Sequence, residues 1–244
     1  MDTGRTVILV ELLGRAPIFG GLESRELEEV LAAARERRVE DGEAVFREGE
    51  PAGWFCVVAD GRLKLTQLGA DGNEVILRFV GPGEATAALA IFEGAEYPVT
   101  ARSVGPTTVL EWERATVQTM LSRHPALAVA TVRLLSERLR EVQERFRELA
   151  TERVARRVAR ALLRLVRQAG RKVEGGVLID LPLSRQDLAK MTGTTLFTVS
   201  RILSEWEARG ILQSGRERVT VTNPHGLVAI AEDLPEQRTG KGKM

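Results

Sequence analysis

The spacing of apolar residues changes twice along the 244-residue chain and divides it into three regions. Between Val39 and Leu110, short apolar runs alternate with polar residues and are interrupted by glycines, as around Leu63-Lys64-Leu65. The dipeptide Asp71-Gly72, which favours a hairpin turn, separates this run from the strand-like segment 75–80. Turn residues about every ten positions predict a compact roll or barrel of short antiparallel strands.

Two helices are expected before this β region. The apolar run Val7 to Leu13 is interrupted by Glu11, which indicates a short helix and not a secretory signal. The segment Ser24 to Arg37 predicts a second helix. Its apolar face consists of Leu27, Val30, Leu31 and Ala34. No apolar run approaches the roughly 20 residues that a membrane span needs, so we expect a cytoplasmic protein without a membrane partner.

From Pro125 the spacing becomes helical and stays free of glycine and proline as far as Gly170. So long a helix is unusual, and we expect a break near Ala150 to Arg153. Apolar residues in its first part are separated alternately by four and three positions, which is the a/d repeat of a coiled coil. This seam consists of Ala128, Val132, Leu135, Leu139, Val142, Phe146 and Leu149. Charged residues flank it, so we expect a homodimer; the alternative, a helix packed on its own domain, usually has a wider apolar face.

Charge is divided unevenly along the chain, although the total is only +1. Residues 1–150 carry 18 Lys and Arg against 24 Asp and Glu, a net charge of −6. Residues 151–244 carry 17 against 10, a net charge of +7. A basic excess confined to the last third would attract a phosphate backbone, although a basic helix is often only a solvated face.

Residues 183–210 predict two short helices joined by a tight glycine turn, the arrangement of a helix-turn-helix. Ser184 and Asp187 form a capping box for the first helix, which ends at Gly193. Either of the two threonines that follow can cap the second helix, which ends at Gly210. The segments on either side of Ser214-Gly215-Arg216 alternate like strands and predict a β-hairpin wing.

The outer face of the second helix mixes groups suited to bases with groups suited to phosphates. Arg201 is the first candidate for base readout, because its guanidinium fork matches O6 and N7 of guanine. The other candidates for base contact are Ser200, Phe197 and Leu196. The residues expected to hold phosphates are Arg185, Gln186, Thr195 and Thr198, with Arg216 and Arg218 of the wing.

These motifs, in this order, resemble the catabolite activator and fumarate-nitrate regulator (CRP/FNR) family of transcription regulators over about residues 17–227. Residues 41–65 resemble that family's cyclic-nucleotide-binding roll, and residues 183–203 resemble its helix-turn-helix. We therefore expect an α+β fold in four parts. They are a β-roll sensor of jelly-roll type (1–124), a dimerisation helix (125–150), a winged helix-turn-helix (151–230) and a flexible tail (231–244).

The resemblance implies a sequence-specific DNA-binding transcription regulator that acts as a homodimer. Its expected partners are double-stranded DNA and RNA polymerase, with activation as the expected effect. It also implies palindromic sites whose half-sites lie one helical turn, about 34 Å, apart. Where better-known members use a glutamate that accepts from cytosine, this chain has Phe197, which can instead press on a thymine methyl group.

Departures from the family pattern argue against a cyclic nucleotide as effector. Members that bind one carry a Gly-Glu pair for the ribose and an Arg-Ser or Arg-Thr pair for the phosphate. These positions correspond to Ala87-Ala88 and to about Tyr97-Pro98 here. A buried cyclic phosphate would then have no charged partner, so we expect regulation independent of cAMP. Gly83-Glu84 comes too early for the ribose role and is interpreted as a turn.

No cofactor is expected. One cysteine, Cys56, cannot supply an iron-sulfur cluster and is expected to be a small core residue. Haem bound through His124, or another small effector, is an alternative, although His124-Pro125 is more simply the start of a helix. A constitutive regulator, or an architectural DNA-binding protein that tolerates many sequences, is a further alternative. An enzyme is not expected, because a phosphate-binding glycine loop, a GxSxG motif and a metal cluster are all lacking.

Overall fold

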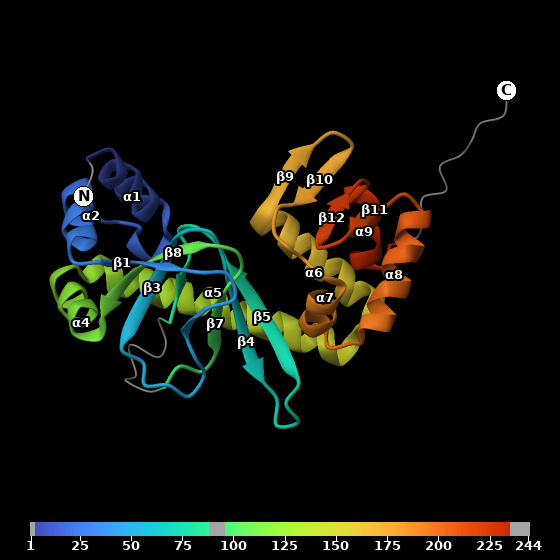
Figure 1. Cartoon of the computed structure of the whole chain (residues 1–244), viewed down its shortest axis with the longest axis horizontal. Coiled ribbons are helices and arrows are strands. Elements are labelled where there is room, and N and C mark those ends of the chain that lie inside the picture. The colour runs from blue at the N-terminus through green and yellow to red at the C-terminus, as the bar shows by residue number, and fades with distance from the viewer. Residues whose placement is uncertain (1–2, 88–95, 235–244) are drawn as a thin grey trace. The chain divides into compact units, whose positions relative to one another are not determined.

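The computed structural model describes residues 3–87 and 96–234, which form two compact units divided after Gln143 (Figure 1). The first unit is a β-roll with helices, and the second combines helices with a small sheet. Helix α5 (Pro125–Thr151) contributes residues to both units. Within the described ranges, no helix has both the length and the hydropathy required to cross a membrane.

The described strands of the first unit form two antiparallel four-stranded sheets. One has the order β1-β8-β3-β6 and consists of β1 (Arg35–Val39), β8 (Thr107–Glu113), β3 (Trp54–Asp60) and β6 (Ala85–Thr86). The other has the order β2-β7-β4-β5 and consists of β2 (Ala44–Phe46), β7 (Thr100–Ser103), β4 (Leu63–Leu68) and β5 (Glu74–Val80). Except for β4 and β5, which form a hairpin, neighbouring strands are not consecutive in the chain, and the predicted jelly-roll architecture is confirmed.

Strand β3 contributes to two cores, because successive residues of a strand point to opposite faces. Cys56 and Val58 belong to a core that draws on both sheets and so lies between them. Phe55 and Val57 belong to a second core on the other face of the sheet, shared with helices. These helices are α1 (Thr3–Arg15), the 3-10 turn η1 (Pro17–Phe19), α2 (Ser24–Ala32), α4 (Arg114–Arg123) and α5.

The helix predicted over residues 24–37 is shorter than expected. Helix α2 ends at Ala32, and Arg35 to Val39 pair with β8 as strand β1. Arg37 then bonds Glu111 at 3.4 Å, and Val39 enters the core between the sheets. Tertiary contacts of this kind outweigh the helix propensity of an arginine-rich segment, so this boundary of the prediction was wrong.

The predicted break in the long helix is confirmed. Helix α5 ends at Thr151, and α6 (Val154–Ala169) begins after Arg153, whose backbone is extended. Helix α6 buries an apolar face that includes Val158, Leu162 and Leu165. The break separates the exposed seam of α5 from a helix that belongs to the core of the second unit.

The second unit contains one antiparallel sheet of order β11-β12-β10-β9 within its described residues. Its strands are β9 (Gly170–Val173), β10 (Gly176–Ile179), β11 (Leu212–Gly215) and β12 (Arg218–Val221). Its remaining helices are α7 (Arg185–Thr192), α8 (Leu196–Ala208) and α9 (Pro224–Glu232). Strand β9 was not predicted from the sequence, and α9 extends beyond the predicted boundary at 230. Of the predicted tail, residues 235–244 lie outside the described residues.

Candidate nucleic-acid interface

Helix α7 begins and ends at the residues that the sequence indicated. The side chain of Ser184 accepts a hydrogen bond from the N–H of Asp187 at 3.0 Å, and the Asp187 carboxylate accepts one from the N–H of Ser184 at 3.1 Å. At the other end, Gly193 has φ +60°, a conformation that a side chain disfavours. The capping box and the glycine turn of the helix-turn-helix are therefore confirmed.

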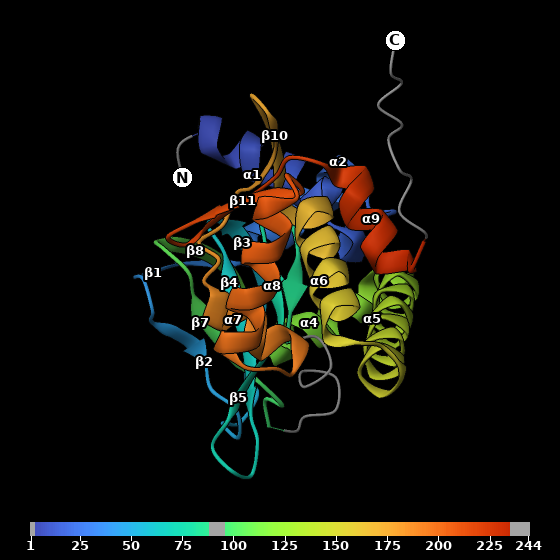
Figure 2. The same cartoon turned by 90° about the vertical axis from the view of Figure 1, so that its right-hand side faces the viewer.

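The two helices pack through apolar residues on their inner faces. These buried residues are Leu188, Ala189, Val199, Ile202, Leu203 and Trp206. Ala189 is 1% exposed, and its small side chain suits a position where the helices cross closely. With its inner face buried, α8 presents the opposite face outward (Figure 2).

Thr195 and Thr198 form the cap at the start of α8. The Thr195 hydroxyl accepts from the N–H of Thr198 at 3.2 Å, and the two hydroxyls lie 3.0 Å apart. Thr195, and not Thr194, is therefore the N-cap. Both threonines stand at the positive end of the helix dipole, where a phosphate would also be attracted.

Large apolar side chains are exposed on the outer face of α8. Phe197 is 77% exposed and Leu196 is 47% exposed. Arg201 is also exposed and lies one helical turn beyond Phe197, so both occupy the same face. Ser200, between them in sequence, is partly exposed. An apolar side chain beside a guanidinium is a surface suited to a base edge and a thymine methyl group.

A hollow of about 440 Å³ adjoins this face. The starts of α7 and α8 and the turn of the wing supply its lining, which consists of Ser184, Arg185, Gln186, Leu196, Gly215, Arg216 and Glu217. The structure thus brings Arg185, Gln186 and Arg216, all predicted phosphate ligands, to one concave site. Arg218, the fourth expected ligand on these elements, is exposed at the start of β12 but does not line the hollow.

The wing is fastened to α8, the second helix of the helix-turn-helix, by residues that were not among the predicted site residues. One carboxylate oxygen of Glu207, on α8, accepts from the N–H and from the hydroxyl of Ser214, each at 2.7 Å. Arg185 donates to the same hydroxyl at 3.1 Å. Glu207 and Ser214 are seven positions apart in different elements, and no short-range pattern in the sequence joins them.

Arg157 of α6 fastens the turn between the two helices. Its guanidinium donates to the carbonyl oxygens of Thr192 at 3.0 Å and Gly193 at 3.4 Å. It also donates to the carbonyl of Glu152, near the end of α5, at 2.8 Å. Since carbonyls at a helix C-terminus lack partners within the helix, Arg157 caps α7 and holds it against the rest of the second unit.

The predicted dimer seam is largely exposed in the single chain. Relative exposures are 64% for Val132, 59% for Leu139, 63% for Val142 and 73% for Phe146. Leu149 and Ala128 are also exposed, whereas Leu135 is only partly exposed. On another face of α5, Leu127, Ala130 and Leu134 are buried. Glu148, one of the charged residues that flank the seam in the sequence, is buried and pairs with Arg164 at 2.7 Å.

The two positions that the family resemblance assigns to cyclic-nucleotide binding have other residues and other contacts here. Tyr97 is 4% exposed, and its hydroxyl contacts both the N–H and the carbonyl of Trp54. Ala87 is described, with φ +66°, but Ala88 lies outside the described residues. Glu84 accepts from the N–H of Gly81 at 2.8 Å and pairs with Arg78 at 2.7 Å, so its interpretation as turn chemistry is confirmed.

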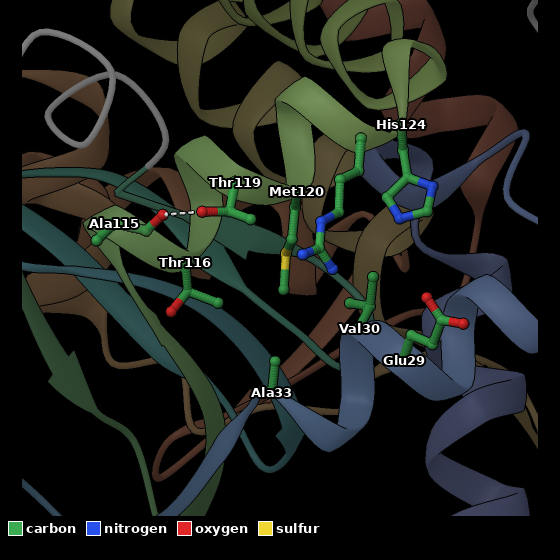
Figure 3. A pocket seen from close by; sticks show the side chains of 9 residues that line it. Glu29, Val30, Ala33, Ala115, Thr116, Thr119, Met120 and His124 are labelled. Atoms are coloured by element: carbon green, nitrogen blue, oxygen red, sulfur yellow. Dashed lines mark hydrogen bonds between the residues drawn. The ribbon is translucent and has the colours of Figure 1, made fainter.

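Cys56 is buried in the core, and His124 pairs with a carboxylate. Cys56 is fully buried, and this burial raises the pKa of its thiol far above the ordinary range, as befits a core residue. His124 contacts Glu26 at 2.8 Å through Nδ1. The N–H of Glu23, followed by the His124 side chain, lowers the pKa of Glu26. His124 and Met120 line a pocket of about 290 Å³ between α2 and α4 (Figure 3).

Comparison with known proteins gives two family matches in one chain. Residues 36–124 match a cyclic nucleotide-binding domain, and residues 156–230 match a Crp-like helix-turn-helix domain. The cyclic AMP receptor protein of Thermus thermophilus is 30% identical over 219 residues, which cover 90% of this chain and 98% of the relative. A CRP-like cAMP-activated global transcriptional regulator of Mycobacterium tuberculosis is 25% identical over 91% of this chain and 99% of the relative.

Solved structures show the same similarity. FixK2 of Bradyrhizobium japonicum superposes with a TM-score of 0.72 at 27% identity, over 81% of this chain and 96% of that one. The c-di-GMP responsive global regulator CLP of Xanthomonas campestris gives a TM-score of 0.71 at 27% identity, over 82% of this chain and 99% of that one.

Proposed function

The chain belongs to the CRP/FNR family of DNA-binding transcription regulators, and on that basis we propose that it binds palindromic DNA as a homodimer that does not respond to cAMP. The observation that carries the proposal is the outer face of α8, where Arg201 and Phe197 are exposed beside the hollow at the wing. Contact with RNA polymerase, activation and a cytoplasmic location rest on family membership alone.

Base and phosphate contacts fall to different parts of this surface. Arg201 reads a G·C pair through its two parallel N–H donors, and Phe197 packs on the methyl group of a neighbouring thymine. Ser200 and Leu196 complete the base-facing set. Arg185, Gln186 and Arg216 hold phosphates at the hollow, assisted by Arg218 and by the start of α8 at Thr195 and Thr198. The phosphate contacts fix the register in which Arg201 meets its base.

A dimer formed along α5 carries a second copy of α8, which can contact the second half-site. Exposed side chains such as Leu139, Val142 and Phe146 would leave water on pairing with a second copy, and burial of each large apolar side chain favours association by about 1.5–3 kcal/mol before entropy losses. A two-fold dimer then presents two copies of α8 to half-sites about 34 Å apart.

The expected independence from cAMP is supported by the residue at the position of the phosphate-binding arginine. Tyr97 stands where a cyclic-nucleotide-binding member has the arginine that pairs with the phosphate, and its hydroxyl is already engaged by Trp54. A tyrosine in that place offers the cyclic phosphate no positive charge. The Mycobacterium relative is named for activation by cAMP, and the proposal separates this chain from it on that property.

Selection from a randomised duplex library tests the proposal directly. Purified full-length protein should enrich two inverted half-sites, each with a fixed G·C pair. The Arg201→Ala variant should lose about 1–3 kcal/mol of discrimination at that pair. Arg209→Ala, which removes an arginine just after the other end of α8, is the matched control and should retain it.

Two results would overturn the proposal. One is recovery of no preferred sequence by the wild-type protein, which would indicate an architectural binder. The other is a rise in affinity for the selected site when cAMP is added, which would show that this chain binds the nucleotide despite Tyr97.

A further inference from the structure

Glu207 makes a contact that bears on the geometry of the whole DNA-facing surface. It lies on the last turn of α8, and a single one of its oxygens accepts two hydrogen bonds from Ser214 of β11, both at 2.7 Å. Charge-assisted bonds of this length are among the stronger ones in proteins. They join the recognition helix directly to the first strand of the wing.

The position of Ser214 in the sheet explains why such a partner is needed. Among the described strands, β11 is the edge of its sheet, so its amides that point away from β12 face no described strand. The Ser214 N–H is such a donor, and Glu207 satisfies it. A free edge amide would otherwise bind water and leave the strand less constrained against α8.

The hydroxyl of Ser214 extends this link to a third element. It donates to Glu207 and accepts from Arg185 of α7 at 3.1 Å. Arg185 is therefore held through Ser214 by a carboxylate that it does not itself contact. A guanidinium has five N–H donors, so one bond to Ser214 leaves others for a phosphate.

Other parts of the wing are fixed by the backbone. The carbonyl of Ile211 accepts from the N–H groups of Thr222 and Asn223, each at 3.0 Å, which fastens the base of the hairpin. The N–H of Leu183 donates to the carbonyl of Glu217 at 3.1 Å, which fastens its turn. Glu207 acts between these two points, where β11 passes the start of α7.

We propose that Glu207 is a positioning residue for DNA binding, which sets the wing and Arg185 at the separation that one backbone phosphate requires. The inference rests on the proposed function, because it concerns how the same surface meets DNA. Glu207 does not contact DNA in this account. Its loss should weaken the phosphate contacts at the hollow while the base contact of Arg201 stays intact.

The salt dependence of binding separates these effects. Each phosphate contact contributes about 0.9 to the slope of log Kobs against log salt concentration. Loss of the Arg185 contact in both protomers should therefore make this negative slope shallower by about 1.8 in Glu207→Ala, measured on the duplex that the wild-type protein selects. The ratio of affinities for the G·C site and for its A·T-substituted form should not change. Glu207→Gln, whose amide oxygen still accepts from Ser214, should restore the slope.

Glu205→Ala is the matched control. Glu205 lies on the same helix, carries the same charge and pairs with Arg209 at 3.6 Å, away from the wing. Its removal measures the effect of deleting one negative charge from α8, so the difference between the two variants isolates the contact with Ser214.

Hydrogen exchange of residues 212–221 in the free protein gives a readout that needs no DNA. The Ser214 amide should exchange faster in Glu207→Ala and at the wild-type rate in Glu207→Gln. Unchanged exchange, or faster exchange with an unchanged salt slope, would overturn the inference while leaving the proposed function intact. Failure of the wild-type protein to select any site would overturn the proposed function, and with it the role of Glu207 in DNA binding.

Discussion

The hydroxyl of Tyr97 is bonded to both backbone groups of Trp54: it accepts from the N–H at 2.9 Å and donates to the carbonyl at 3.0 Å. The ring of Tyr97 also stacks on Phe46, with ring centroids 4.1 Å apart. The side chain therefore supports the roll from within, at about the position that the family resemblance assigns to a phosphate-binding arginine. These contacts link the side chain of Tyr97 to the stability of the fold.

Tyr97→Phe should destabilise the protein without changing its affinity for DNA. The substitution keeps the ring and leaves two backbone groups of Trp54 without their partner, which lowers the free energy of unfolding by about 1–3 kcal/mol. Urea denaturation of the wild type and the variant measures this difference. Equal stability would mean that the hydroxyl contributes nothing, and a loss of DNA affinity at full folding would mean that Tyr97 belongs to an effector pathway.

Leu139→Glu should convert the dimer to a monomer. Leu139 is 59% exposed in the single chain, and a carboxylate at this seam position would be buried opposite its own copy in the dimer. Sedimentation velocity should show one protomer, and affinity for the selected palindrome should fall on the order of 10²-fold or more because bivalent binding is lost. Gln143→Glu adds a carboxylate beside the seam and should stay dimeric. Dimers of Leu139→Glu would place the interface elsewhere.

Glu217→Asn should raise DNA affinity. Glu217 lines the hollow with a carboxylate that would repel a phosphate, and its φ of +55° is one that asparagine adopts more readily. We expect roughly fivefold tighter binding per protomer, on specific and non-specific duplexes alike. Fluorescence anisotropy at fixed salt measures this change. Glu174→Gln, on the other hairpin of the same sheet, is the control, and an equal gain from it would show only an effect of net charge.

Glu111 should give the stability a dependence on pH. Burial raises the pKa of this carboxyl above its ordinary value of 4.5, although Arg37 and Arg35 oppose the shift. A raised pKa favours folding at low pH, and that contribution is lost as pH rises through the pKa in the folded state. The unfolding free energy of Glu111→Gln, relative to wild type, should therefore increase as pH rises above 4.5.

Urea denaturation across this range measures that trend. Glu113→Gln, an exposed residue of the same strand, is the matched control. A constant difference between Glu111→Gln and wild type at all pH values would contradict the burial effect.

Local chemistry made parts of the fold predictable. The capping box at Ser184 and the left-handed turn at Gly193 depend on neighbours within one helical turn, and both were found where expected. The break after Thr151 was predictable for a different reason, since so long a helix without a stop is rare. The pairing of Arg35 to Val39 with β8 depends on residues more than sixty positions away, so pattern analysis extended a helix into it.

The candidate site shows the same limit. Exposure of Phe197 and Arg201 followed from helical periodicity alone. The link between Glu207, Ser214 and Arg185 requires three elements to meet, and no spacing in the sequence encodes it. Glu148 is a further example. Its position beside the seam suggests an exposed side chain, but in the structure it pairs with Arg164 of α6 and is buried.

Counting protein copies on DNA tests the central claim most directly. Native mass spectrometry of the full-length protein with a duplex bearing the selected palindrome should give two protomers per duplex. The Leu139→Glu variant, mixed with a duplex of equal length that carries a single half-site, should give one protomer per duplex. A wild-type complex with one protomer on the palindrome would contradict the account, because the exposed seam of α5 would then join nothing.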